Sequence, residues 1–214
     1  MEAAEAAEHI RESLEKRRHA DEEFRRRAAV VIGLLAMLLA ITHLGGAAAT
    51  KETINFNILA SDTWAFFQAK NIRQTSNQLA ADELEIRLLE PGLLAEVRAA
   101  AQPKFDRYKA TVARYESEPD PKDPDNPIRG DGKKELMARA QYFEKLRDHA
   151  QQQIPSFEYA EALFQIGIVV GSVSIVAAAR WLLGLGVALG ALALVLMLNG
   201  FFLFMNLPIG EVPH

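Results

Sequence analysis

Two stretches of this chain are almost free of charged residues, and they restrict its fold more than any other feature. Positions 28–49 contain no Lys, Arg, Asp or Glu, and positions 162–207 contain Arg180 as their one charged residue. An α-helix of about 20 apolar residues crosses the hydrocarbon core of a bilayer. The first stretch is long enough for one such helix and the second for two. We therefore predict an all-α membrane protein with three transmembrane helices, at 28–49, 162–180 and 182–207.

The remaining residues are highly charged, with both signs interspersed and a formal net charge of −4 over 214 residues. A balanced surface of this kind argues against a nucleic-acid partner, which would need a basic patch. The chain contains no cysteine, so disulfides and thiolate metal sites are excluded. Most of the charge lies in 1–27, predicted to form a charged N-terminal helix, and in 50–161, predicted to form an extramembrane helical hairpin.

The basic residues nearest to the apolar stretches predict how the chain is oriented in a membrane. Five residues are assigned to the membrane interface: Arg25, Arg26, Arg27, Arg180 and Trp181. Basic residues close to a span stay on the cytoplasmic side, and Trp is favoured at the headgroups. The N-terminus is then cytoplasmic, and 50–161 and the tail 208–214 lie on the opposite side. A secretory signal cleaved near Ala49 is an alternative, but the long charged segment 1–27 favours an uncleaved anchor.

The segment 50–161 carries an apolar residue at every seventh position, which predicts a long packed helix. These residues are Ile58, Ala65, Ile72, Leu79, Ile86, Leu93 and Ala100. The neighbouring seam positions include Asp62, Ser76 and Glu83. Because those positions are polar, a helical bundle is favoured over a free-standing two-stranded coiled coil.

Proline and glycine predict where the helices of this segment end. Pro91 and Gly92 are expected to break the outgoing helix, and we favour a path in which the chain doubles back there. Residues 117–133 are rich in Pro, Asp and Gly, which predicts a loop. A returning helix then leads into the second span.

Two groups of residues are predicted to make helix contacts. In "ASDTWAFFQAKNIRQ", residues 60–74, Trp64 and Phe67 share a helix face, and packing against the returning helix is their expected role. The amides around them suit a bundle or an oligomer whose seams are joined by side-chain hydrogen bonds. Small residues four apart in the second and third spans let helices approach closely. The interaction residues are Trp64, Phe67, Gln68, Asn71, Gly167, Gly171, Gly186 and Gly190.

No grouping of residues in the sequence predicts a reaction or a metal site. The five histidines are scattered, and none belongs to a His-x-x-x-His pair or a helical Glu-x-x-His motif that would gather metal ligands on one helix face. We therefore expect no enzyme activity, no catalytic residue, no cofactor and no bound metal.

Polar residues within or beside the spans leave two interpretations open. His43 in the first span and Asn199 in the third are costly in hydrocarbon, so they are candidates to pair or to bind a ligand. We favour the alternative, in which each lies near a span end and bonds a neighbour. Glu158 and Glu161, at the mouth of the second span, are candidates to bind a cation, although a solvated carboxylate pair is favoured.

Two sequence motifs carry a resemblance to a known family. "ASDTWAFFQAKNIRQ" follows the first span, and "FQIGIVVGSVSIVAAARWLLGLGVALGALALVLMLNGFF" lies near the end of the chain. Together they resemble bacterial membrane proteins of the domain of unknown function 4337 family. Phe66 and Phe67 stand where that family typically has tyrosines. The resemblance implies a fold and a membrane location, and it implies no activity.

These observations lead to a functional hypothesis. We expect a non-enzymatic subunit of the bacterial inner membrane with 50–161 in the periplasm. It would have a structural, assembly or accessory role through helix association, with membrane lipid and a protein as its partners. That protein would be a further copy of the chain or a larger membrane complex. The alternative is an oligomeric channel or transporter in which His43 and Asn199 face a lumen.

Overall fold

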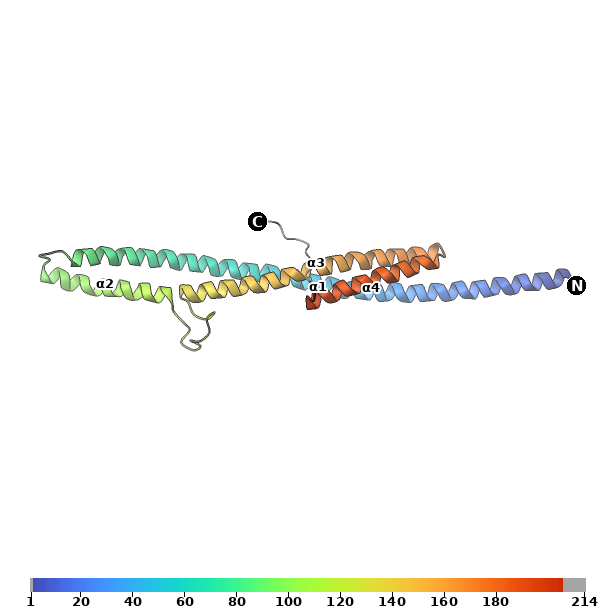
Figure 1. Cartoon of the computed structure of the whole chain (residues 1–214), viewed down its shortest axis with the longest axis horizontal. Coiled ribbons are helices and arrows are strands. Elements are labelled where there is room, and N and C mark those ends of the chain that lie inside the picture. Colours follow the sequence, from blue (N-terminus) through green and yellow to red (C-terminus); the bar gives the residue numbers. More distant parts are fainter. Residues whose placement is uncertain (1, 206–214) are drawn as a thin grey trace. The chain divides into compact units, whose positions relative to one another are not determined.

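The computed structural model describes residues 2–205, which form four α-helices (Figure 1). The helices are α1 (Glu2–Leu88), α2 (Ala95–Glu116), α3 (Lys133–Val176) and α4 (Arg180–Phe202). No β-strand occurs in this described part of the chain, so the predicted all-α class is confirmed. The helices α1, α3 and α4 each contain a segment long and apolar enough to cross a membrane. The predicted tail, 208–214, lies outside the described residues.

The chain divides into two compact units, which are described separately. The span unit comprises Met1–Lys51 and Ala150–His214, and the hairpin unit comprises Glu52–His149. All three apolar helices contribute to the buried core of the span unit. The residues of this core are Leu35 of α1, Ala160 and Phe164 of α3, and Ala193 and Met197 of α4.

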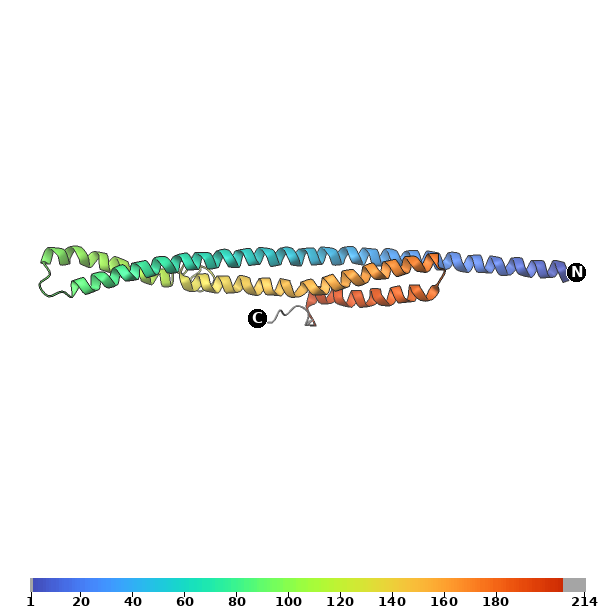
Figure 2. The same ribbon diagram turned by 90° about the horizontal axis from the view of Figure 1, so that it is seen from above.

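Glycines let α3 and α4 approach closely in the span unit, where the two helices lie side by side (Figure 2). A Cβ added at Gly186 would lie 3.0 Å from the carbonyl oxygen of Gly167, and one added at Gly167 would lie 3.1 Å from that of Gly186. A Cβ on Gly171 or Gly190 would meet side chains of α1. The two glycine pairs predicted for helix packing therefore make their contacts within one chain.

The structure moves the boundaries of the second and third spans. Helix α3 ends at Val176 and α4 begins at Arg180, so residues 177–179 form the turn, rather than Arg180 and Trp181. The three turn residues are alanines, which hydropathy does not distinguish from a span. Helix α4 ends at Phe202, before the predicted end at 207, because the next residue adopts the left-handed conformation.

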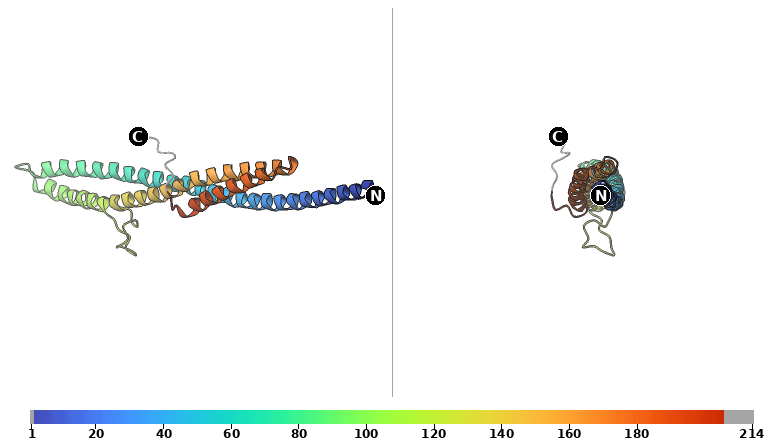
Figure 3. Two further views of the ribbon diagram at one scale, coloured as in Figure 1. Left: turned by 45° about the vertical axis from the view of Figure 1, so that its right-hand side comes forward. Right: turned by 90° about the vertical axis from the view of Figure 1, so that its right-hand side faces the viewer.

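The chain doubles back after α1 in the hairpin unit, as we favoured. The turn contains Gly92 with a φ of +90°, a conformation that glycine adopts without strain. Helix α2 then runs back along α1 (Figure 1), and the Nζ atom of Lys109 lies 3.6 Å from a carboxylate oxygen of Glu85. A loop of residues 117–132 leaves the helices before α3 returns (Figure 3).

The seven-residue stripe predicted as the packed seam of this unit is exposed, so that prediction is wrong. We call Ile58, Ala65, Ile72, Leu79 and Ile86 the outer stripe. Its large members Ile58, Ile72, Leu79 and Ile86 are 53%, 67%, 65% and 69% exposed. Helix α1 packs through its opposite side, the inner face, which includes Ala60, Thr63, Phe67, Lys70, Gln74 and Ala81. The inner face mixes polar with apolar residues. The apolar pattern of the sequence therefore pointed to the outer stripe and not to the inner face, which is the side that packs.

Candidate functional site

Trp64 packs against the returning helix in the hairpin unit, as expected. Its indole N–H donates a hydrogen bond of 2.8 Å to a carboxylate oxygen of Glu144 on α3. The ring meets that of Phe67 edge to face, with 5.4 Å between the ring centres. By contrast, Gln68 and Asn71 are exposed, so a role for their side chains in helix contacts stays a prediction.

Lys70 lies at the centre of a cluster that joins α1 to the loop. It is 7% exposed. Its ammonium group donates one hydrogen bond of 3.1 Å to Glu118 and another to the backbone carbonyl of Asp131. The rings of Phe66 and Tyr115 lie 5.7 Å and 5.4 Å from the same nitrogen. A buried charge needs such partners, so we call these five residues the lysine clamp.

A second lysine, Lys133 of α3, contacts Gln74, which lies one turn after Lys70 on α1. The ammonium group of Lys133 donates a 2.8 Å hydrogen bond to the side-chain oxygen of Gln74 and lies 3.7 Å from Glu116. The side-chain nitrogen of Gln74 donates to Glu116 and to the backbone carbonyl of Val112, both at 3.0 Å. The hydrogen bond from Gln74 to the Glu116 carboxylate lowers the pKa of Glu116 most, and the positive charge of Lys133 lowers it further. The pKa of Glu116 therefore lies below its ordinary value.

Glu135 and Arg139 of α3 fix the two ends of the loop. The carboxylate of Glu135 is buried and accepts hydrogen bonds from the Ser117 hydroxyl at 2.7 Å and the Glu118 backbone N–H at 3.1 Å. Burial raises the pKa of Glu135, but these two hydrogen bonds outweigh burial, and the net pKa lies below its ordinary value. The guanidinium of Arg139 donates to the backbone carbonyls of Ile128 and Gly130.

The lowered pKa values predict that the loop contacts weaken in acid. A carboxylate with a lowered folded-state pKa contributes stability above its unfolded pKa of about 4.3, and this contribution is lost as the pH falls through the folded-state value. We expect the thermal unfolding midpoint to fall as the pH drops below about 4.3, and to fall less in Glu135→Gln. Circular dichroism against temperature measures both, and equal slopes in the two proteins would contradict the assignment.

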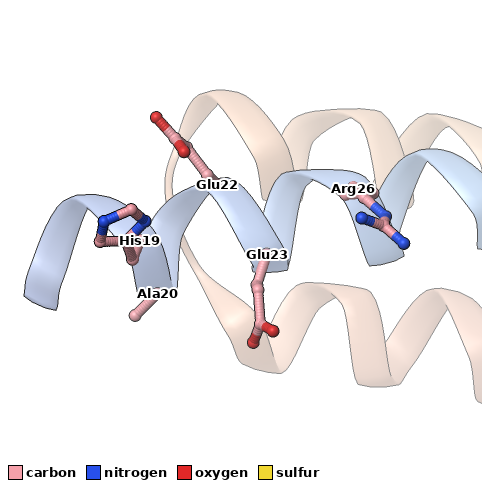
Figure 4. A pocket seen from close by; sticks show the side chains of 5 residues that line it. All are labelled: His19, Ala20, Glu22, Glu23 and Arg26. Carbon is pink, nitrogen blue, oxygen red and sulfur yellow. The ribbon is translucent and has the colours of Figure 1, made fainter.

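The described residues contain no group of three or more His, Cys, Asp or Glu placed to hold a metal ion. A hollow on α1 is lined by His19, Ala20, Glu22, Glu23 and Arg26 (Figure 4). All five come from two turns of one helix, so the hollow is an open groove on a helix surface. In the hairpin unit, the charged groups Lys70, Glu135 and Arg139 bond groups of the loop.

Asn199 is buried in the span unit, and its side chain forms hydrogen bonds with residues near the end of α4. It is 1% exposed. Its amide nitrogen donates to the Ser156 hydroxyl at 2.9 Å and to the backbone carbonyl of Met205 at 3.0 Å. Its amide oxygen accepts from the backbone N–H of Met205 at 2.7 Å. The interpretation that Asn199 bonds neighbours near a span end agrees with these contacts, and the expectation that it faces a lumen does not.

His43 has different partners from Asn199, so the structure does not bring the two together. The exposed imidazole of His43 lies 3.4 Å from a carboxylate oxygen of Glu161, which also accepts a 3.3 Å hydrogen bond from Gln165. Glu158 is exposed. Of the two glutamates predicted at the mouth of the second span, Glu161 therefore lies beside the histidine of the first span.

The residues assigned to the membrane interface gather at one end of the span unit. A guanidinium nitrogen of Arg180 lies 3.9 Å from a carboxylate oxygen of Asp21, and the guanidinium carbon lies 5.9 Å from the ring centre of Phe24. Arg25, Arg26 and Arg27 directly follow that ring in α1 and are exposed. Trp181 is exposed next to Arg180.

A family comparison agrees with this architecture. The family model described as "Domain of unknown function (DUF4337)" matches residues 24–203. The chain belongs to this family. The match takes in the hairpin unit and all three apolar segments, and it confirms the resemblance carried by the two motifs. No curated protein and no solved structure matches this DUF4337 chain.

Most of the residues that fix the loop of this DUF4337 protein were not predicted from the sequence. They are Lys70, Glu118, Lys133, Glu135 and Arg139. One signal was present, because Lys70 is the only basic residue between positions 52 and 72, and it follows an aromatic pair in the family motif. The other partners come from the loop and α3, and no local pattern relates them to Lys70.

Proposed function

We propose that this DUF4337 protein is a non-enzymatic structural, assembly or accessory subunit of the bacterial inner membrane. It acts through helix association, either with further copies of itself or with a larger membrane complex. The contrast between the two sides of α1 in the hairpin unit carries this proposal. The inner face packs within the chain, whereas the outer stripe exposes four large apolar side chains. Apolar side chains that recur every seven residues on one helix face are typical of a surface that packs along another helix.

The polar clusters of the hairpin unit support a role in holding shape. The lysine clamp satisfies its central ammonium group with a carboxylate, a carbonyl and two rings of the same chain. Glu135 and Arg139 likewise use backbone groups of the loop. Groups that are already paired in this way fix the loop on the helices, and they supply a rigid surface for a partner.

We assign the N-terminus to the cytoplasm and the hairpin unit to the periplasm. Support comes from the contact between Arg180 and Asp21, which gathers the basic residues at one end of the span unit. A cysteine replacing the exposed Asp125 of this cysteine-free chain is expected to react with an impermeant maleimide in spheroplasts. A cysteine replacing Glu22 is the control and should react only after lysis. Reaction of the Glu22→Cys protein alone would reverse the orientation.

A channel or transporter is the second candidate, and the pair of His43 with Glu161 is the observation that favours it. Both residues are titratable and belong to different apolar helices, and His43 is exposed. A ring of several copies would place His43 toward a lumen, with Asn199 remaining buried in each copy. Purified protein in liposomes that passes no ion at any voltage or pH would exclude this function.

The mass and composition of the native particle test the proposed function. The protein is extracted from its own membranes in a mild detergent, and the particle is analysed by native mass spectrometry. We expect either a homogeneous assembly of this chain or a stoichiometric complex with other proteins. A single copy that carries only lipid would contradict a structural or accessory role.

A further inference from the structure

Helix α1 carries two seven-residue patterns on opposite sides. One belongs to the inner face and runs through Ala60, Phe67, Gln74 and Ala81, and the other is the outer stripe. The two patterns differ by two positions, which at 3.6 residues per turn is a rotation of about 200°. A seven-residue apolar repeat is the pattern of a helix that packs along another helix. The inner pattern has its partners within the chain, and the outer stripe is left exposed.

We infer that the outer stripe is a dimer seam, which pairs in parallel and in register with the outer stripe of a second copy. This inference rests on the proposed function and specifies its self-associating form. Leu93 and Ala100, which continue the spacing in the sequence, lie beyond the end of α1 and take no part. The seam therefore has five layers, from Ile58 to Ile86, on one uninterrupted helix.

Membrane anchoring selects a second copy as the partner and fixes the direction of pairing. The first apolar segment, 28–49, and the outer stripe belong to the same helix. Two copies that are inserted in the same direction carry their stripes in the same direction, at the same sequence distance from the span. Identical residues then meet across a twofold axis, as in an isologous interface. Confinement to one membrane also raises the effective concentration of the two stripes.

The residues beside the stripe are complementary in this arrangement. With the stripe at the a positions of a heptad, each g position of one helix faces an e position of the other. Three of these pairs join an amide to a carboxylate or hydroxyl of the second copy: Asn57 with Asp62, Asn71 with Ser76, and Gln78 with Glu83; a fourth joins Trp64 to Ala69. Within its own chain the Asn57 oxygen accepts a 3.4 Å hydrogen bond from Arg147, and the Gln78 nitrogen donates one of 2.6 Å to Asp82, so the amide N–H groups of Asn57 and the second N–H of Gln78 would make the contacts between copies. Glu90, the e position opposite Glu85, lies beyond the end of α1, and the Glu85 carboxylate is 3.6 Å from Lys109 in its own chain.

The d positions of this heptad are polar, so we expect pairing to depend on the anchoring of both copies in one membrane. The first three are Ser61, Gln68 and Thr75, which are uncharged and exposed. The fourth is Asp82, which is half-buried and whose carboxylate lies 4.0 Å from Lys109 of its own chain. Polar residues inside a seam weaken it and fix its register. Gln68 would meet its own counterpart, and Asn71 lies at one of the flanking pairs. The two exposed amides predicted for helix contacts thus both belong to this interface.

Cysteine cross-linking of the full chain in its native membranes tests the seam, because the protein has no cysteine of its own. Ile72→Cys and Leu79→Cys are expected to give a covalent dimer with a mild oxidant, since a disulfide needs Cβ atoms about 4 Å apart. Two exposed positions are matched controls: Arg73→Cys, turned about 100° from the stripe, and Ala110→Cys on α2. We expect at least a tenfold lower yield of dimer at the controls.

A second variant separates the seam from the fold. Ile72→Asp with Leu79→Asp should abolish the dimer and leave the helix content unchanged, because both side chains are exposed in one chain. Equal cross-linking at all four cysteine positions would overturn the seam. An assembly or foreign complex without cross-linking at the stripe would overturn the seam and leave the proposed function in place. A lone chain without cross-linking would overturn both.

Discussion

Replacing Gly186 with leucine is expected to lower the free energy of unfolding of the span unit by about 3 kcal/mol, the upper end of the usual cost of overpacking. A Cβ at this position lies 3.0 Å from the carbonyl oxygen of Gly167 and 3.5 Å from the backbone nitrogen of Gly171. Both neighbours are backbone atoms, which cannot rotate aside as a side chain can. Leucine must therefore push α3 and α4 apart. Reversible unfolding of the purified protein in mixed micelles measures the loss.

Gly184→Leu is the matched control for this prediction. Gly184 lies on the same helix two residues earlier, and a Cβ added there meets no atom within 4 Å. Leucine favours a helix by about 1 kcal/mol relative to glycine, so the control should be unchanged or slightly more stable. An equal loss in both variants would mean that added bulk on α4, and not the contact between the two helices, causes the effect.

Features that repeat over many residues could be predicted from the sequence. A span is an average over about 20 positions, so a few misplaced residues do not obscure it. The glycine pairs were also visible, because residues four apart lie on one helix face whatever the partner is. The turn between α3 and α4 was misplaced because its three alanines are as apolar as the spans they join.

The contacts that fix the loop could not be predicted in the same way. Lys70 bonds residues 48 and 61 positions away, and their approach depends on where the chain doubles back. The inner face of α1 contains this lysine and Gln74, so polar residues interrupt its apolar pattern. The outer stripe is the more apolar of the two and was therefore taken for the core. The hydropathy of a side chain indicates how favourable its burial would be. It does not identify the segment of the chain against which that side chain packs.

Replacing Lys70 with methionine is expected to release the loop and to lower the free energy of unfolding of the hairpin unit by about 2 kcal/mol, within the range for hydrogen bonds to charged groups. Methionine preserves most of the apolar side chain but removes the donor to the Asp131 carbonyl, and it leaves the Glu118 carboxylate with Arg114, 3.9 Å away, as its cationic partner. The loss is smaller than for a fully buried pair because Glu118 is 39% exposed and water can hydrate it. Limited digestion with proteinase K measures the opening of the loop through the rate of cleavage within 117–132.

Lys145→Met controls for the loss of a positive charge, because Lys145 lies on α3 in the same unit and is exposed. Its cleavage rate and unfolding midpoint should match those of the wild-type protein. Lys70→Arg gives a further comparison, since it keeps the charge but replaces the compact ammonium group beside the rings of Phe66 and Tyr115 with a larger planar guanidinium. We expect Lys70→Arg to be cleaved at an intermediate rate. Wild-type cleavage in Lys70→Met would mean that Glu135 and Arg139 hold the loop without the lysine, and that the clamp contributes little to its position.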